Sequence, residues 1–217
     1  MIALPVPSLS SDRVAIIVCE AMAGEMRTVA GEKNIPFVMH VINSQCHRDP
    51  IILKSKIAEA LNLFEDEMGV FVAYGKCSSY AGNDQPIVQG FKDLNCASIL
   101  LGGDSEYEKL AAGTYFLTPY LALHWKEYFL GKMDDCPLDR KSAKRLEKWF
   151  EPIGRVVKIN IRPETEEIEN LSAREFSSAI NKPLFYVPGT LDLLRREYDR
   201  LCSKFTETSV RRVRHGG

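Results

Sequence analysis

The sequence predicts an α/β protein built on a mostly parallel sheet flanked by helices. Short runs rich in β-branched and aromatic residues alternate with longer segments that have helical spacing of apolar residues. The run at residues 69–74 is continuously apolar, as expected of a parallel strand covered on both faces. The 217 residues are 45% hydrophobic and 26% charged, which is an ordinary globular composition.

The first half of the chain yields these elements in order. An apolar β-rich run predicts a strand at residues 14–18, and helix formers before Gly31 predict a helix at 20–30. A second strand at 36–42 leads to a polar loop at 43–49, and Pro50 suits the start of a helix at 51–63. After the strand at 69–74 come a polar loop at 78–84, a short strand at 86–91 and a helix at 96–101, with Asn95 as its N-cap.

The second half continues the alternation. We expect helices at residues 105–110, 119–130, 142–150 and 191–205, and strands at 114–117, 155–161 and 184–187. The acidic segment at 164–169 is expected to be exposed. We expect one domain over residues 1–217, and residues 152–154 are the best place for a hinge if it has two lobes. The part beyond residue 152 is interpreted as scaffold, or as a subunit interface of a homo-oligomer through the last helix.

The charge and hydropathy pattern restricts the partners and the compartment. The formal net charge of −1 gives no global field for nucleic acid, and the basic tail at residues 211–215 is interpreted as a frayed, solvated end. No apolar run is long enough to cross a membrane, and the N-terminus lacks the regions of a signal peptide. We therefore expect a cytoplasmic protein whose six cysteines are reduced.

Three cysteines stand at the ends of predicted elements. Cys19 follows the first strand, Cys77 follows the strand at 69–74, and Cys96 opens a helix. If the strands are parallel neighbours, the three sulfur atoms converge on one rim of the sheet, where α/β proteins bind ligands. The helix N-termini at Cys19 and Cys96 are expected to lower the pKa of both thiols. No Cys-x-x-Cys pair supports a metal site, so three small buried core residues are the alternative.

Other polar residues are expected on the same rim. His47, beside Cys46, is a candidate fourth ligand or proton carrier, and a surface loop histidine is the alternative. Glu25 could point back at the rim as an acid or base, against the alternative of an exposed helix residue. Tyr74 and Lys76, at the end of the clearest strand, could orient an anionic substrate. Cys136, Cys202 and His124 are assigned no chemical role.

Several phrases in the chain together resemble a known family. They are Cys19-Glu20 with Glu25, residues 46–50 (Cys-His-Arg-Asp-Pro), residues 74–77 (Tyr-Gly-Lys-Cys), Asn95-Cys96, and residues 113–119 (Gly-Thr-Tyr-Phe-Leu-Thr-Pro). Over roughly residues 14–200 the chain resembles the prokaryotic family catalogued as domain of unknown function 1638. The family pattern maps onto Cys19, His47, Cys77 and Cys96. The chain departs from the pattern at Cys46, Asn95 and Ser78, and the absence of an aspartate at position 95 argues against an acid role there.

The resemblance implies an anaerobic setting and an association with corrinoid-dependent methyl transfer. The first hypothesis is therefore a metal-binding protein acting on a small molecule in sulfur or one-carbon metabolism. Cys19, Cys77 and Cys96 would hold an iron–sulfur cluster with one open iron, or zinc with His47 as fourth ligand. The second hypothesis is a non-catalytic accessory or binding protein of a corrinoid methyltransferase system. A third is metal-free thiol catalysis by Cys77 with His47 as base.

Overall fold

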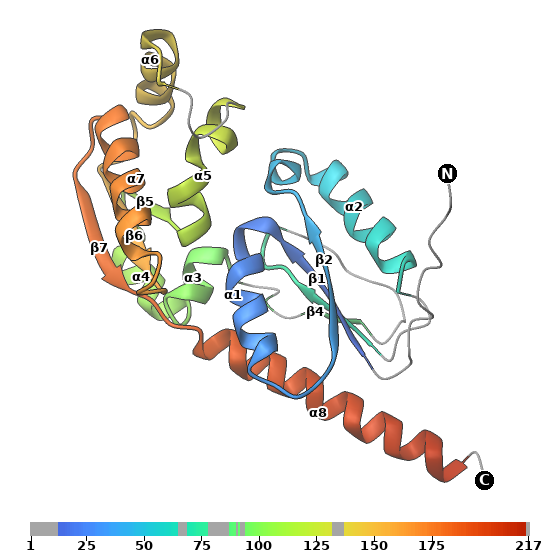
Figure 1. Cartoon of the computed structure of the whole chain (residues 1–217). Coiled ribbons are helices and arrows are strands. Elements are labelled where there is room, and N and C mark those ends of the chain that lie inside the picture. The colour runs from blue at the N-terminus through green and yellow to red at the C-terminus, as the bar shows by residue number, and fades with distance from the viewer. Residues whose placement is uncertain are drawn as a thin grey trace.

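The computed structural model describes residues 13–64, 69–77, 87–89, 91, 94–131 and 137–215, and for residues 48, 87–89 and 204–215 only the backbone. It confirms the α/β class, with every described strand pair parallel. The strands form two sheets, in the orders β2-β1-β3-β4 and β5-β6-β7, where the sequence suggested one (Figure 1). The segment before residue 13, the loop at 78–84 and Cys136 lie outside the described residues.

The first sheet is built from four strands with helices on both faces. The elements are β1 (Val14–Cys19), α1 (Glu20–Gly31), β2 (Phe37–Ile42), the 3-10 helix η1 (Ser44–Arg48), α2 (Pro50–Asn62), β3 (Val70–Ala73) and β4 (Ile87–Gln89). β1 is buried throughout, and its side chains alternate between the faces. Ile16 and Val18 pack with α1, whereas Ile17 and Cys19 pack with α2.

The second sheet follows a pair of short helices. The elements are α3 (Cys96–Leu100), α4 (Asp104–Ala111), β5 (Thr114–Leu117), α5 (Pro119–Leu130), α6 (Arg140–Trp149), β6 (Arg155–Asn160), α7 (Glu166–Ala179) and β7 (Leu184–Pro188). An aromatic cluster that includes Trp125 and Phe176 fills the space between this sheet and helices α5 to α7. Because β5 and β6 pair, residues 152–154 lie inside this unit, and a hinge there stays a prediction.

The last helix, α8 (Asp192–His215), returns to the first sheet. Leu194, Tyr198 and Leu201 are buried in the same cluster as Met26 and Phe71. Ion pairs Arg195–Glu32 and Lys33–Asp199 fix its outer side to the end of α1. The backbone stays helical to His215, so the prediction of a frayed end was wrong for the backbone of residues 211–215. None of the described helices has the length and apolar character needed to span a membrane.

One long helix was not predicted from the sequence. Residues 166–179 form α7, of which only an exposed acidic segment at 164–169 was predicted. Glu169 is in fact completely buried, because it pairs with Lys158 of β6, whose side chain is also 0% exposed. A lysine inside a strand and a glutamate in an acidic run do not look like a core pair until they are placed together.

Candidate thiol site

Cys19 is both the last residue of β1 and the N-cap of α1. The backbone N–H of Ala21 donates to its sulfur atom at 3.4 Å, so the thiol takes the place of the usual serine or aspartate cap. The side chain is 2% exposed. Because β3 pairs directly beside β1, the segment that follows β3 carries Tyr74 and Cys77 to the same end of the sheet.

A tight backbone crossing brings Cys96 to that end. The N–H of Lys76 donates to the Leu94 carbonyl at 2.7 Å, and a Cβ atom on Gly75 would stand 1.9 Å from the same oxygen. Only glycine allows the two segments to approach this closely. Asn95 then caps α3 with a reciprocal bond to Ser98, which fixes Cys96 as the first residue of that helix.

The cysteines at this end interact electrostatically. Cys19 and Cys77 both act on Cys96, and together with Cys46 these thiols also act on Tyr74. We call these four cysteines and Tyr74 the thiol edge. Cys77 is exposed, Cys46 and Cys96 are partly buried, and Cys19 is buried. β1 and β3 are paired parallel neighbours, as the sequence predicted, so Cys19 and Cys77 follow strands that end on the same side of the sheet. That the three thiols form one functional site stays a prediction.

The pKa values of Cys19 and Cys96 are raised, whereas the sequence predicted that they would be lowered. Burial raises the pKa of Cys19 to about 12, and the hydrogen bond from Ala21 offsets only part of this effect. Burial also raises the pKa of Cys96 well above its ordinary value. The predicted lowering by helix N-termini was therefore wrong, because loss of solvation outweighs the helix end. Both groups are protonated thiols at neutral pH in the protein alone.

The thiol edge is divided by the sheet. Cys19 and Tyr74 pack on the α2 face, with Cys46 beside them, whereas Cys96 packs against the cluster on the α1 face. Among the residues that the structure describes, no group of three or more His, Cys, Asp or Glu side chains is placed to hold a metal ion. The donor types therefore suit a soft metal, but the described positions are not a finished set of ligands.

Two polar atoms, one in the thiol edge and one next to it, are buried and without a hydrogen-bond partner among the described residues. They are the Tyr74 hydroxyl and Nε2 of His47, whose rings lie 5.7 Å apart. The hydroxyl is near enough to Cys19 to affect its pKa, but not in hydrogen-bond geometry. Burial lowers the pKa of His47, so its ring is neutral at pH 7. Buried polar atoms normally have partners, so these two are candidate contacts for a group bound at this edge.

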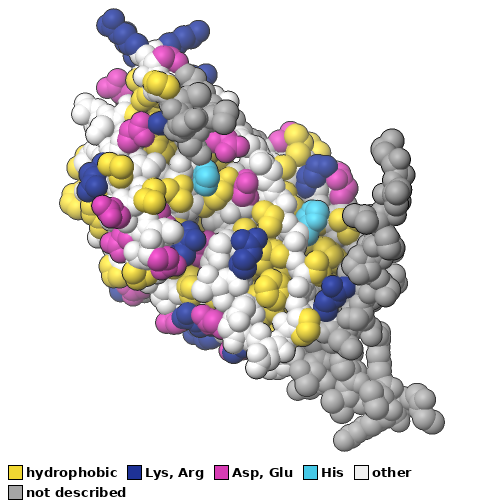
Figure 2. Space-filling model, in the orientation of Figure 1, with side chains coloured by type: hydrophobic (Ala, Val, Ile, Leu, Met, Phe, Trp, Pro, Cys, Tyr) yellow, Lys and Arg dark blue, Asp and Glu magenta, His cyan; other side chains and the backbone are white. Residues whose placement is uncertain are grey.

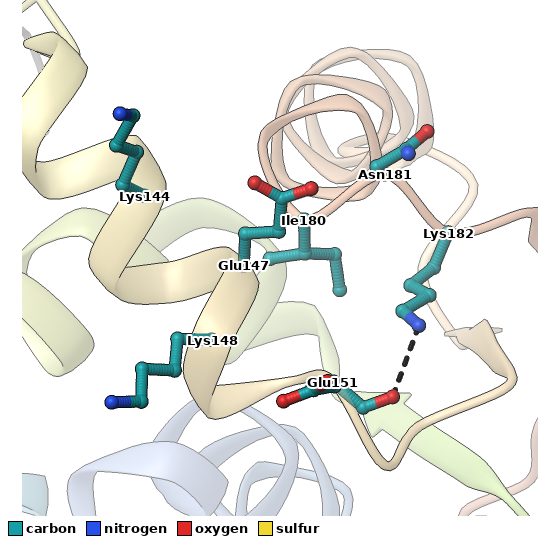
Figure 3. A pocket seen from close by; sticks show the side chains of 7 residues that line it. All are labelled: Lys144, Glu147, Lys148, Glu151, Ile180, Asn181 and Lys182. Carbon is teal, nitrogen blue, oxygen red and sulfur yellow. Dashed lines mark hydrogen bonds between the residues drawn. The ribbon is translucent and has the colours of Figure 1, made fainter.

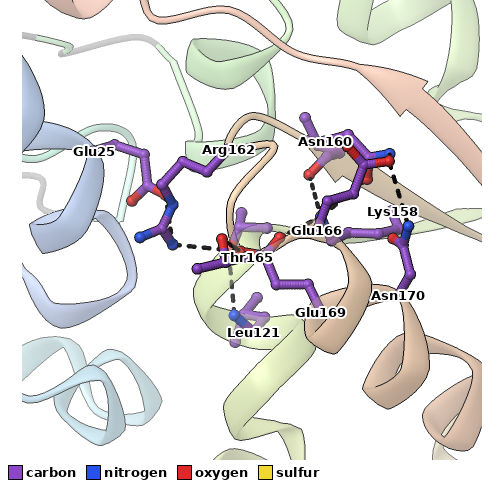
Figure 4. A network of polar contacts seen from close by, with 11 residues as sticks. Glu25, Leu121, Lys158, Asn160, Arg162, Thr165, Glu166, Glu169 and Asn170 are labelled. Atoms are coloured by element: carbon purple, nitrogen blue, oxygen red, sulfur yellow. Dashed lines mark hydrogen bonds and ion pairs between the residues drawn. The ribbon is translucent and has the colours of Figure 1, made fainter.

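Glu25 lies in a buried charge network between the two sheets (Figure 4). Its side chain is 1% exposed, and the Arg162 guanidinium approaches it at 3.4 Å and Glu169 at 3.5 Å. Glu169 in turn pairs with Lys158 at 2.5 Å. Burial raises the pKa of Glu25, although Arg162 opposes this, and Glu25 acts electrostatically on Cys96. Of the two interpretations made from the sequence, the exposed helix residue was wrong.

A second set of hydrogen-bonded side chains connects the start of α1, next to Cys19, with α5. Glu20 accepts hydrogen bonds from the N–H and hydroxyl of Ser44, and that hydroxyl lies 3.3 Å from the Tyr120 hydroxyl. The Tyr120 ring stacks on His124 at 4.4 Å, where the helix departs from helical dihedrals. Burial alone would raise the pKa of Glu20, but the hydrogen bonds from Ser44 and Tyr120 lower it overall.

Lys76, a predicted site residue, faces solvent, and Arg162, a member of the charge network, was not predicted. Lys76 is exposed, 4.0 Å from Asp104. Arg162 comes two residues after the carboxyl end of β6. The rule that pointed to the cysteines, that ligands bind at the carboxyl ends of parallel strands, would also have pointed to it.

The fold and the thiol edge define the class of protein: a two-sheet parallel α/β protein with a cysteine-rich strand end between its sheets. The chain belongs to the family described as a protein of unknown function (DUF1638), whose model matches residues 41–198. The resemblance expected from the sequence is thus confirmed. No curated protein and no solved structure matches the chain.

Proposed function

We propose that the thiol edge is a soft-metal site and that the protein uses it on a small molecule in anaerobic sulfur or one-carbon metabolism in the cytoplasm. Cys19, Cys77 and Cys96 are the proposed thiolate ligands, an iron–sulfur cluster is the first candidate cofactor and zinc the second. The observation that supports the proposal is geometric: Cys19 and Cys77 follow paired parallel strands, and the hydrogen bond from Lys76 to the Leu94 carbonyl brings the start of α3, with Cys96, to the same end. Thiolates are the ligands that such metals prefer.

The proposal requires a local rearrangement, because the described thiols are not arranged around one point. Cys77 is exposed, so its side chain can turn towards the other two without disturbing the core. His47 is the proposed fourth ligand on zinc, since its ring is neutral and its Nε2 atom has no described partner. When bound, the metal would supply Lewis-acid or redox chemistry. Tyr74, Lys76 and Glu25 are the proposed residues for orienting the small molecule and its protons.

The raised thiol pKa values give the proposal a measurable signature. Metal binding must remove protons from Cys19 and Cys96, so affinity should rise with pH and protons should be released. A protein that bound metal only through surface carboxylates would not show this dependence.

The test is metal and acid-labile sulfide content after anaerobic purification and reconstitution. Alanine variants of Cys19, Cys77 and Cys96 are compared with Cys202→Ala, which removes a buried thiol from α8. We expect each of the three variants to lose the metal and the control to keep it. Iron with sulfide supports the cluster, and zinc without sulfide supports the Lewis-acid form. Metal that survives all three substitutions, or no metal in any preparation, overturns the proposal.

The second candidate is an accessory protein for a corrinoid methyltransferase system. Its support is a set of exposed apolar side chains on β2, on α2 and directly after α2, of which Ile51 is 80% exposed and Leu63 60% exposed. Exposed apolar surface often marks protein contacts, and Ile51 and Leu63 stand at the two ends of α2. A metal-free preparation that binds a corrinoid methyltransferase, and loses binding on Ile51→Asp, would favour this function. Rapid alkylation of Cys77 alone in metal-free protein, abolished with His47→Ala, would instead favour thiol catalysis.

A further inference from the structure

The outer edge of β7 has the character of an interface. β7 is the last strand of its sheet, and no described strand pairs with its outer side. Phe185 and Tyr186 on this strand are 50% and 41% exposed. Ile168 and Leu171, on α7 nearby, are 66% and 65% exposed. Natural proteins protect open strand edges with charge, proline or bulges, and large exposed apolar residues do the opposite.

The hydrogen bonds within the sheet show which backbone groups are available. Val156 donates to the Pro183 carbonyl, and Gly189 donates to the Asn160 carbonyl. In a parallel pair the bonds alternate along the strand, so the odd-numbered residues of β7 direct their backbone groups to β6. Leu184 and Tyr186 therefore direct an N–H and a carbonyl each away from the sheet. Pro188, without an N–H, ends this row.

The two ends of β7 carry opposite charge. At its start, Lys182 lines a groove of about 530 Å³ together with Lys144 and Lys148 of α6 (Figure 3). Glu147 and Glu151 also line this groove, but α6 as a whole has five basic residues and one acidic residue. At the end of the strand, Pro188 and Tyr186 lie beside Glu166, in the acidic first turn of α7. Figure 2 shows apolar and charged side chains mixed over the surface of this half of the molecule.

From these observations we propose that the occupant of the β7 edge is a second copy of this chain, paired antiparallel about a two-fold axis at Phe185. The N–H and carbonyl of Leu184 in one copy then bond to the carbonyl and N–H of Tyr186 in the other. The symmetry-related pair forms the same two bonds. The antiparallel arrangement sets the basic start of one β7 against the acidic end of the other. Two three-stranded sheets become one continuous sheet. This inference is independent of the thiol site.

The first test removes one outward backbone donor. Tyr186→Pro deletes an N–H that makes no bond to β6, and edge strands accept proline. We expect the wild type to sediment as a dimer at high concentration and to dissociate on dilution. Tyr186→Pro should be monomeric at every concentration, with an unchanged circular dichroism spectrum. The matched variant Tyr186→Thr keeps the donor and should still dimerise.

The second test checks the register. Across the proposed axis the two Phe185 residues form a non-hydrogen-bonded pair, with Cα atoms about 4.5 Å apart. This spacing permits a disulfide, so Phe185→Cys should give a cross-linked dimer on mild oxidation, in a Cys77→Ser background. Leu63→Cys, with a similar exposure on the other half of the molecule, is the control and should not cross-link. A wild type that stays monomeric at millimolar concentration, or a dimer in which Phe185→Cys fails to cross-link, overturns the proposal.

Discussion

The buried thiol of Cys19 should react far more slowly than an ordinary cysteine. Moving a thiol pKa from 9.0 to about 12 lowers the thiolate fraction at pH 8 by about 1000-fold. A thiolate of higher pKa is more nucleophilic, and a Brønsted coefficient of about 0.45 restores roughly 20-fold. Acidity alone therefore predicts alkylation of Cys19 roughly 50-fold slower than that of an unstructured reference peptide. The low exposure of the side chain, 2%, slows the reaction further.

The assay is timed iodoacetamide labelling at pH 8, with labelled peptides quantified by mass spectrometry. Cys77, which is exposed, is the internal comparison and should be labelled first. Labelling of Cys19 at the rate of the reference peptide would show that the thiol is solvated, and the explanation by burial would be wrong. The same comparison with Cys19→Ala confirms the peptide assignment.

The raised pKa of Cys19 also predicts how stability depends on pH. The folded protein holds this proton more tightly than the unfolded chain, so the contribution is complete below the unfolded pKa of 9.0. It is lost as pH rises from 9 towards 12, at up to about 1.4 kcal/mol for each pH unit. Urea unfolding between pH 8 and pH 10.5 should show a steeper loss for the wild type than for Cys19→Ala. Parallel slopes in the two proteins would refute this reasoning.

Two further predictions concern the scaffold. Lys158→Met removes the nearer of the two cations beside the buried carboxylate of Glu169 and leaves only Arg162 at 3.5 Å, so it should cost about 3 kcal/mol of unfolding free energy, whereas Lys158→Met with Glu169→Leu should recover most of this loss in urea titrations. A single-variant loss below about 1 kcal/mol would contradict the burial of the pair. Gly75→Ala places a methyl group against the Leu94 carbonyl and should lower the melting temperature sharply, whereas at Gly31, in α1, an added Cβ meets nothing within 4 Å, so Gly31→Ala should melt at or slightly above the wild-type temperature. Equal melting temperatures for the two glycine variants would show that the crossing is not tight.

Local patterns were sufficient to predict the elements around the thiol edge. The apolar run at β3 and the alternation at β6 give strands because both patterns arise from burial of one or two faces. The convergence of Cys19 and Cys77 followed from one further rule, that neighbouring parallel strands end at the same side. These inferences need no knowledge of distant contacts.

What the sequence did not predict depends on contacts between distant segments. Glu169 looks solvated in an acidic run, and only its pairing with Lys158 makes α7 a buried helix. The pKa of Cys19 was predicted in the wrong direction because the helix end is local, whereas burial depends on α2 and β3. The split into two sheets likewise depends on which strands pair, and alternation of strands and helices does not specify that.

The position of α8 has a consequence for synthesis of the protein. One face of the first sheet, with Ile16 and Phe71, is covered partly by Tyr198 and Leu201, close to the end of the described chain. As the chain leaves the ribosome, α1 covers part of this face at once, but the part under α8 stays uncovered until more than half of the polypeptide after Phe71 has been made. A chain that stops before α8 should aggregate rather than yield a smaller folded protein.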